Sequence, residues 1–123
     1  MLENKFYKIL SIDKHDDTSA TYHVAILPDC NVYEGHFPGD PVCPGVCNIE
    51  TIKECASDLV GRPLRIHTIK QCRLTAIATP TVCPEVDVTV NVSVNDDACV
   101  VLATIADASQ TYMEFKGQLT FDL

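Results

Sequence analysis

The chain has 123 residues, of which 46% are hydrophobic, so it can form one hydrophobic core but not two. We therefore expect a single domain over residues 1–123, with no second domain to hold a separate cofactor. The net charge of −8 disfavours nucleic acid or an anionic membrane surface as a partner.

The N-terminal segment does not have the pattern of a signal peptide. It carries Glu3, Lys5 and Lys8 where a signal peptide needs an unbroken apolar run, and no later segment is as long as a membrane-spanning helix. The seven cysteines are odd in number and irregularly spaced, which favours reduced thiols that act as small core residues. These features predict a cytoplasmic protein without membrane insertion.

The first half of the chain predicts two strands, a long loop and one helix. Residues 6–12 and 20–27 form the pair of strands. The helix is expected over about 45–60, with Pro44 just inside its start and Gly61 at its stop. Its apolar stripe consists of residues 46, 49, 52, 56, 59 and 60.

The second half of the chain predicts antiparallel strands. Residues 64–77 resemble one long strand whose alternation slips near Thr68 and Ile69, as a bulge would cause. Residues 86–94 and 98–106 form a hairpin around a polar turn. A last strand follows, with one apolar face that consists of Met113, Phe115, Leu119 and Phe121.

This order of elements predicts an α+β fold. An antiparallel sheet must bury its apolar face, and the single helix is the only available filling, so we expect the sheet to wrap around a central helix. A helix this apolar, covered by one sheet, also predicts a partner subunit that completes its burial.

The loop before the helix reads EGHFPGDPVCPGVCNIE over residues 34–50. Gly35 and Gly39 permit tight bends, while three prolines fix φ along the loop, which therefore holds its shape. His36 is the side chain in this loop that can exchange a proton near neutral pH.

The start of the helix adds two further groups. Gly45 and Val46 present free backbone N–H groups at the positive end of the helix, where a carbonyl oxygen can gain negative charge. Glu50 lies about 7.5 Å further along the axis. Its neighbours Cys47, Ile49 and Ile52 form a dry setting that favours the protonated carboxyl group, although the helix N-terminus favours the ionised carboxylate. With His36, these groups suit removal of a proton α to a carbonyl and protonation of a leaving hydroxyl.

The same stretch resembles the active-site motif of the 3-hydroxyacyl-acyl-carrier-protein dehydratases of the FabZ and FabA type. The resemblance lies in the HFPG and PG elements and in an acidic residue fourteen positions after the histidine, as from His36 to Glu50. It implies a hotdog fold and dehydration of a carrier-bound 3-hydroxyacyl thioester to the trans-2-enoyl thioester, without metal, nucleotide or other cofactor.

The resemblance also implies roles for individual residues. His36 would take the α-proton, and Glu50 from the other subunit of a homodimer would act on the β-hydroxyl. The Gly45 N–H would polarise the thioester carbonyl. The residues expected to shape the substrate loop are Phe37, Pro38, Gly39 and Pro44. Cys43 and Cys47 depart from the larger apolar residues of the family, and the later proline-glycine-aspartate turn is reduced to Pro84-Glu85-Val86.

The segment from Leu59 to Pro84 contains no acidic residue. Its basic residues are Arg62, Arg65, Lys70 and Arg73. An acyl carrier protein is strongly acidic, so these residues are candidates for docking it. The alternative is a solvated strand face.

Three alternatives to the dehydratase remain. Cys30, His36, Cys43 and Cys47 could bind zinc, but their spacing lacks a CxxC pair. Cys43 or Cys47 could be an activated nucleophile at the helix start, but no second histidine lies nearby in the sequence. A hotdog thioesterase or a non-catalytic acyl-binding subunit is the third alternative, and the presence of both His36 and Glu50 argues against the thioesterase.

Overall fold

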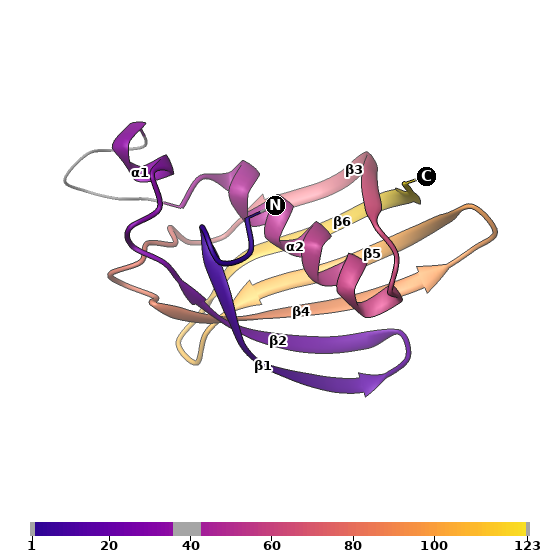
Figure 1. Ribbon diagram of the computed structural model, residues 1–123, viewed down its shortest axis with the longest axis horizontal. Helices are drawn as coiled ribbons and strands as arrows, with labels where there is room; N and C mark the ends of the chain where they lie inside the picture. The colour runs from indigo at the N-terminus through magenta and orange to yellow at the C-terminus, as the bar shows by residue number, and fades with distance from the viewer. Residues whose placement is uncertain (1, 36–42, 123) are drawn as a thin grey trace.

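The computed structural model describes residues 2–35 and 43–122. Six strands and two helices follow one another in these ranges (Figure 1). In chain order they are β1 (Tyr7–Asp16), β2 (Ser19–Ile26), α1 (Val32–Gly35), α2 (Gly45–Val60), β3 (Leu64–Leu74), β4 (Glu85–Val94), β5 (Ala98–Ala106) and β6 (Thr111–Phe121). The predicted elements are all present, and the short α1 lies where the pattern predicted only a loop.

The strands form one antiparallel sheet in the order β1-β2-β4-β5-β6-β3. The predicted hairpin of β4 and β5 is confirmed, and its turn is closed by the Asn95 N–H, which donates to the Ala98 carbonyl at 2.8 Å. In the next turn the Asp107 carboxylate accepts hydrogen bonds from the Tyr112 hydroxyl at 2.6 Å and the Ser109 N–H at 2.8 Å. These bonds, led by that of Tyr112, lower the pKa of Asp107 to about 2.

Helix α2 lies against one face of the curved sheet (Figure 1). Its side chains Ile52, Cys55 and Ala56 are fully buried there, and alternate residues of the strands close the core from the other side. Burying a side chain such as Ile52 stabilises the fold by about 1.5–3 kcal/mol. The prediction of a sheet wrapped around a central helix is therefore confirmed.

The two ends of α2 differ in how they are terminated. Gly61 ends the helix with a φ of 75°, a left-handed conformation that glycine adopts without strain, and its N–H donates to the Ser57 carbonyl at 2.9 Å. Pro44 is the N-cap, with φ −62° and ψ 138°, so it precedes the first turn instead of lying inside it as predicted. Its extended backbone suits an N-cap, because that residue is not yet helical.

Strand β3 forms one edge of the sheet. Its register against β6 shifts between Ile66 and Thr68 and again between Ile69 and Gln71, which confirms the predicted bulge. The strand ends at Leu74 and not at 77, because the chain then leaves the sheet and runs past the start of α2.

Strand β1, in contrast, is longer than predicted. It extends beyond residue 12 because the pairing with β2 continues to Asp16 and Ser19. On β6 the predicted apolar face is confirmed, since Met113, Phe115 and Leu119 are buried.

A network of hydrogen bonds fastens the C-terminal half of α2 to the N-terminal segment and to β2. The Glu54 carboxylate accepts from the Leu2 N–H at 2.8 Å, the Glu3 N–H at 3.1 Å and the Tyr7 hydroxyl at 3.0 Å. One turn later, the Tyr22 hydroxyl donates to Asp58 at 2.7 Å. Burial above all, and then the neighbouring acidic groups, raises the pKa of Tyr7 well above its usual range, so its hydroxyl remains a donor.

Most cysteines have the predicted role in the core. Five of them are buried, namely Cys43, Cys47, Cys55, Cys83 and Cys99. Cys72 departs from the prediction, because it is exposed on the edge strand β3. Within the described ranges, no helix is both long enough and apolar enough to cross a membrane.

Candidate active site at the start of α2

The first turn of α2 has two backbone N–H groups that are free to bind a ligand. They are not those of Cys47 and Asn48, which donate to the Pro44 carbonyl at 3.0 and 3.2 Å. The N–H groups of Gly45 and Val46 meet no acceptor among the residues that the structure describes. Two neighbouring free donors at the positive end of a helix are suited to hold an oxygen that gains negative charge, as predicted for these two residues.

A cavity of about 320 Å³ opens beside these donors. Its walls are Cys43, Asn48, Leu74, Thr75, Ala76, Ile77 and Ala78. The Cys43 N–H donates to the Ala78 carbonyl at 2.8 Å and so ties the chain before α2 to the segment after β3. A Cβ atom at Gly45 would lie 3.7 Å from Leu74 Cδ1, so Leu74 lies close to the helix start. Cys43 and Asn48 in the wall flank Gly45 and Val46 in the chain, so the cavity lies at the same end of the helix as the free N–H groups.

Two apolar residues in the cavity wall are exposed, and so is one at the start of α2. The exposed fractions are 63% for Leu74 and 70% for Ile77 in the wall, and 74% for Val46, which follows Gly45 in the helix. Large apolar side chains with such exposure mark a surface that a ligand or another protein covers.

Glu50 lies in the second turn of α2 on a different face from this cavity. Two residues of an α-helix are about 200° apart around its axis, so Glu50 and Asn48 point in nearly opposite directions. The Glu50 side chain is 34% exposed, and its Oε2 lies 2.9 Å from Lys53 Nζ. This contact is within ion-pair distance but lacks hydrogen-bond alignment, so in the described part of the chain the buried Oε2 accepts no hydrogen bond.

Four predicted site residues, His36, Phe37, Pro38 and Gly39, lie outside the described residues. The chain on the two sides of residues 36–42 is joined by Tyr33, whose hydroxyl lies 3.5 Å from Cys43 Sγ. Pro44, the fifth residue of the predicted substrate loop, is buried at the start of α2.

The thiols beside the helix start are not activated. Burial raises the pKa of the Cys43 thiol to about 11 and also raises that of Cys47, so both remain protonated near neutral pH. A nucleophilic cysteine needs the opposite shift. The residues that the structure describes include no group of three or more side chains placed to hold a metal ion, and His36 of the predicted zinc set lies outside them.

The four basic residues predicted to dock a carrier are not equivalent. Arg65 pairs with Asp122 at 2.8 Å, and the Arg62 guanidinium lies 4.0 Å from the centre of the Phe121 ring. Lys70 and Arg73 are exposed, and neither has an ion-pair partner within the described ranges. These two are therefore the better candidates for contact with an anionic partner.

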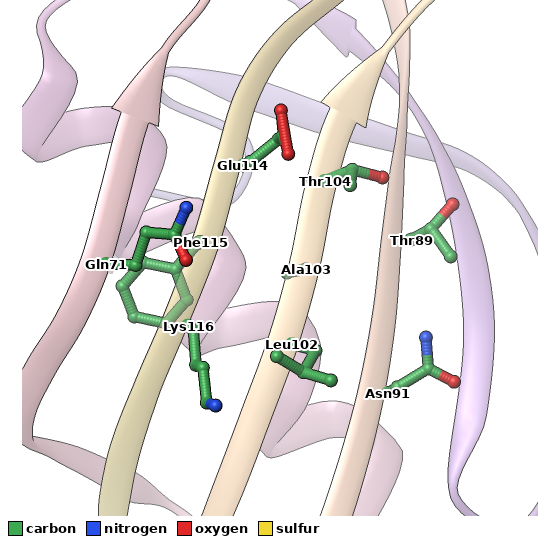
Figure 2. A pocket seen from close by; sticks show the side chains of 9 residues that line it. All are labelled: Gln71, Thr89, Asn91, Leu102, Ala103, Thr104, Glu114, Phe115 and Lys116. Carbon is green, nitrogen blue, oxygen red and sulfur yellow. The ribbon is translucent and has the colours of Figure 1, made fainter.

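A second hollow, of about 260 Å³, lies on the sheet face turned away from α2 (Figure 2). Its lining comprises Gln71, Thr89, Asn91, Leu102, Ala103, Thr104, Glu114, Phe115 and Lys116. Figure 2 shows mostly polar side chains standing on neighbouring strands. Arg73 is the cross-strand neighbour of Glu114 at the edge of this surface. The hollow shares no residue with the cavity at α2 and is not part of the candidate active site.

The sequence pattern did not single out Asn48, Lys53 or the segment from Leu74 to Ala78. One signal for Asn48 was present, because it lies four residues before the buried Ile52 and so interrupts an apolar helix face with an amide. The segment after β3 carried no such signal, since only the closed fold brings it to the helix.

Comparison with known sequences gives a family match. The sequence model of the ApeI-like family, described as ApeI dehydratase, matches residues 12–116. The 3-hydroxyacyl-[acyl-carrier-protein] dehydratase FabZ of Lactiplantibacillus plantarum is 29% identical over 85 residues, which are 60% of this chain and 58% of that protein. The FabZ of Pediococcus pentosaceus is 40% identical over 60 residues, or 44% of this chain and 39% of that protein. The aligned part thus spans less than two thirds of these relatives.

Solved structures show the same fold. The dehydratase heterocomplex ApeI:P from Xenorhabdus doucetiae has a TM-score of 0.69 at 16% identity, with 92% of this chain and 96% of that chain covered. The conserved protein PA5202 from Pseudomonas aeruginosa has a TM-score of 0.69 at 12% identity, with 98% and 92% covered. At such identities the likeness shows the fold alone, and it confirms the predicted hotdog arrangement.

Proposed function

Because the chain belongs to the ApeI-like dehydratase family, we propose that it removes water from a 3-hydroxyacyl thioester carried on an acyl carrier protein. The family match confirms the resemblance that residues 34–50 indicate. The observation that carries the proposal is the helix start itself, where two free backbone N–H groups lie beside a cavity and a carboxylate follows on the same helix.

The chemistry follows from these groups. The thioester carbonyl oxygen accepts hydrogen bonds from the N–H groups of Gly45 and Val46, which makes the proton on the neighbouring carbon more acidic. His36 takes this proton, and Glu50 donates a proton to the hydroxyl on the next carbon. The C2–H and C3–O bonds break, the C2–C3 double bond forms, and water leaves. We propose no metal or organic cofactor for this step.

We further propose that the active unit is a homodimer, with each chain forming one hotdog domain. Within one chain Glu50 points away from the cavity that adjoins Gly45, so its carboxyl group serves the site of the other chain. The exposed apolar side chains of Val46, Leu74 and Ile77 support the same proposal, because a second subunit would cover them.

Mass spectrometry of carrier-bound substrates tests the reaction. Incubation of the protein with 3-hydroxyacyl carrier proteins of several chain lengths should remove one water from the acyl group. A carrier loaded with the saturated acyl group, which has no hydroxyl to lose, is the matched control. Release of free acid would instead indicate a thioesterase, and an unchanged carrier would indicate a non-catalytic acyl-binding subunit.

A further inference from the structure

The cavity beside the helix start contains a polar group that the proposed chemistry does not use. Asn48 is only 6% exposed, and its side chain lines the cavity. Among the residues that the structure describes, no side chain or backbone group forms a hydrogen bond with its amide. The amide faces an open cavity, so it can form hydrogen bonds there only with water or with a bound ligand, and its presence in the wall points to a ligand that supplies the partner.

The size of the cavity limits what that ligand can be. A volume of about 320 Å³ holds roughly ten non-hydrogen atoms, at about 30 Å³ for each water-sized group. Leu74, Ala76, Ile77 and Ala78 provide apolar walls, as a hydrocarbon segment requires. The cavity therefore suits a short segment of an acyl chain that carries one polar atom opposite Asn48.

The position of that atom follows from the helix geometry. Asn48 lies nearly one turn beyond Gly45, and one turn of about 5.4 Å equals the span of roughly four carbon–carbon bonds. With the thioester carbonyl at the Gly45 N–H, the amide would meet the acyl chain near its fifth atom. The 3-hydroxyl is a different group, since the proposed reaction places it at Glu50 of the second subunit.

We propose that Asn48 determines substrate specificity, and that the enzyme prefers acyl thioesters with a hydrogen-bonding oxygen near the fifth position over purely hydrocarbon chains. This inference rests on the proposed function, because it places the thioester at the start of α2. A site that hydrogen-bonds a substrate oxygen discriminates against the analogue that lacks it, since a bound hydrocarbon chain displaces water from the amide and leaves it without a partner.

Binding of two matched thioesters tests the inference. Octanoyl-pantetheine and 5-oxaoctanoyl-pantetheine differ only in a methylene replaced by an ether oxygen, and neither carries a 3-hydroxyl to lose as water. Calorimetry with the wild-type protein should give about tenfold tighter binding of the oxygen-containing thioester. In Asn48→Leu the preference should reverse. Equal preference in wild type and Asn48→Leu would overturn the proposal.

Two further variants separate specificity from folding. Thr51→Val is the matched control, because Thr51 is also buried on α2 but its hydroxyl already donates to the Cys47 carbonyl at 2.9 Å, so the wild-type preference should remain. Asn48→Leu should keep or raise the melting temperature, and a lower melting temperature with loss of both ligands would show a structural role and overturn the proposal.

Asn48→Asp preserves the shape of the side chain. If the leucine variant does not fold, this variant tests whether the Asn48 amide determines the preference for the ether. It should lose the preference for the ether, because a carboxylate offers no amide donor, and a retained preference would overturn the proposal. Since the ligands lack a 3-hydroxyl, the result does not depend on dehydration, which the carrier assay measures separately.

Discussion

The two ends of α2 differ in whether their polar groups have hydrogen-bond partners. At the C-terminal half, the Glu54 carboxylate accepts three hydrogen bonds and Asp58 accepts one from Tyr22. A hollow of about 440 Å³ adjoins this half, but Glu54 and Asp58 in its wall are already bonded. At the N-terminal end, the N–H groups of Gly45 and Val46 and the Asn48 amide have no acceptor or donor in the described ranges.

The bonded polar groups at the C-terminal half stabilise the fold, whereas those at the N-terminal end are available to bind a ligand. A buried group that already has its hydrogen bonds gains little from a substrate, whereas a group without them gains a full hydrogen bond. Substitutions at the C-terminal half should therefore change stability, and substitutions at the N-terminal end should change reaction and binding.

The largest effect is expected at the catalytic pair. His36→Ala and Glu50→Gln should each lower the rate of dehydration by about 10²- to 10⁴-fold, because each removes a proton-transfer group. The melting temperature should hardly change in Glu50→Gln, since the described residues give its side chain only the ion pair with Lys53. Turnover close to wild type in either variant would contradict the role of that residue.

Mixing the two inactive variants sharpens the same prediction. If His36 and Glu50 of one site come from different chains, each mixed dimer contains one intact site and activity should return. Absence of recovery, while subunit exchange is shown by labelled chains, would place both residues of a site in one chain.

The next largest effect is on stability, at the other end of the helix. Glu54→Ala should lower the free energy of unfolding by about 2–4 kcal/mol, because it leaves the Tyr7 hydroxyl and two backbone N–H groups without their acceptor. Chemical denaturation measures this loss, and kcat of the folded protein should stay near wild type. In a double-mutant cycle, Tyr7→Phe should cost less in the Glu54→Ala background than alone. Equal costs in both backgrounds would show that the two side chains are not coupled.

A smaller effect is expected on docking of the acyl carrier protein, and measuring it tests whether the functional region extends onto β3. Reversing Lys70 and Arg73 to glutamate should lower kcat/KM for the carrier-bound substrate by about tenfold at low salt and less at high salt. A pantetheine thioester without the carrier should react as before. Arg65→Gln is the control, because Arg65 is already paired with Asp122. Equal loss on both substrates would show that these residues shape the site and not the docking surface.

The smallest effect distinguishes a structural histidine from the catalytic one. His23 links β2 to β4, with Nδ1 2.7 Å from Asp87 and Nε2 2.7 Å from Glu85. The hydrogen bond with Asp87, and then that with Glu85, raises the pKa of His23 above 6.5. Because the folded-state pKa is raised, its stabilisation is complete below about pH 6.5 and is lost as the pH rises through the folded-state pKa.

Melting temperatures across this pH range measure the effect. His23→Gln should flatten the dependence of stability on pH while leaving the pH profile of kcat unchanged. A changed kcat profile would mean that the titration of His23 reaches the active site.

Short-range patterns in the sequence predicted the elements and the catalytic motif. Alternation with a period of two identified the strands, a helical stripe ended by Gly61 identified α2, and a slip in alternation identified the β3 bulge. Residues 34–50 indicated the dehydratase family, because the histidine, the helix start and the carboxylate follow one another within a single loop and helix. These features depend on residues a few positions apart, so they can be read without the fold.

The tertiary structure alone decided which groups face the cavity and which hold the helix. Leu74 lies close to Gly45, and Glu54 accepts a hydrogen bond from Tyr7, although long stretches of chain separate the residues of each pair. Only closure of the sheet around α2 brings these residues together. Helical periodicity predicted an apolar stripe that does not include Asn48, and it could not show a cavity beside this residue, because the opposite wall comes from the segment after β3. Whether the Asn48 amide has a hydrogen-bond partner depends on that distant segment, since a hydrogen bond requires a donor and an acceptor within about 3 Å of each other.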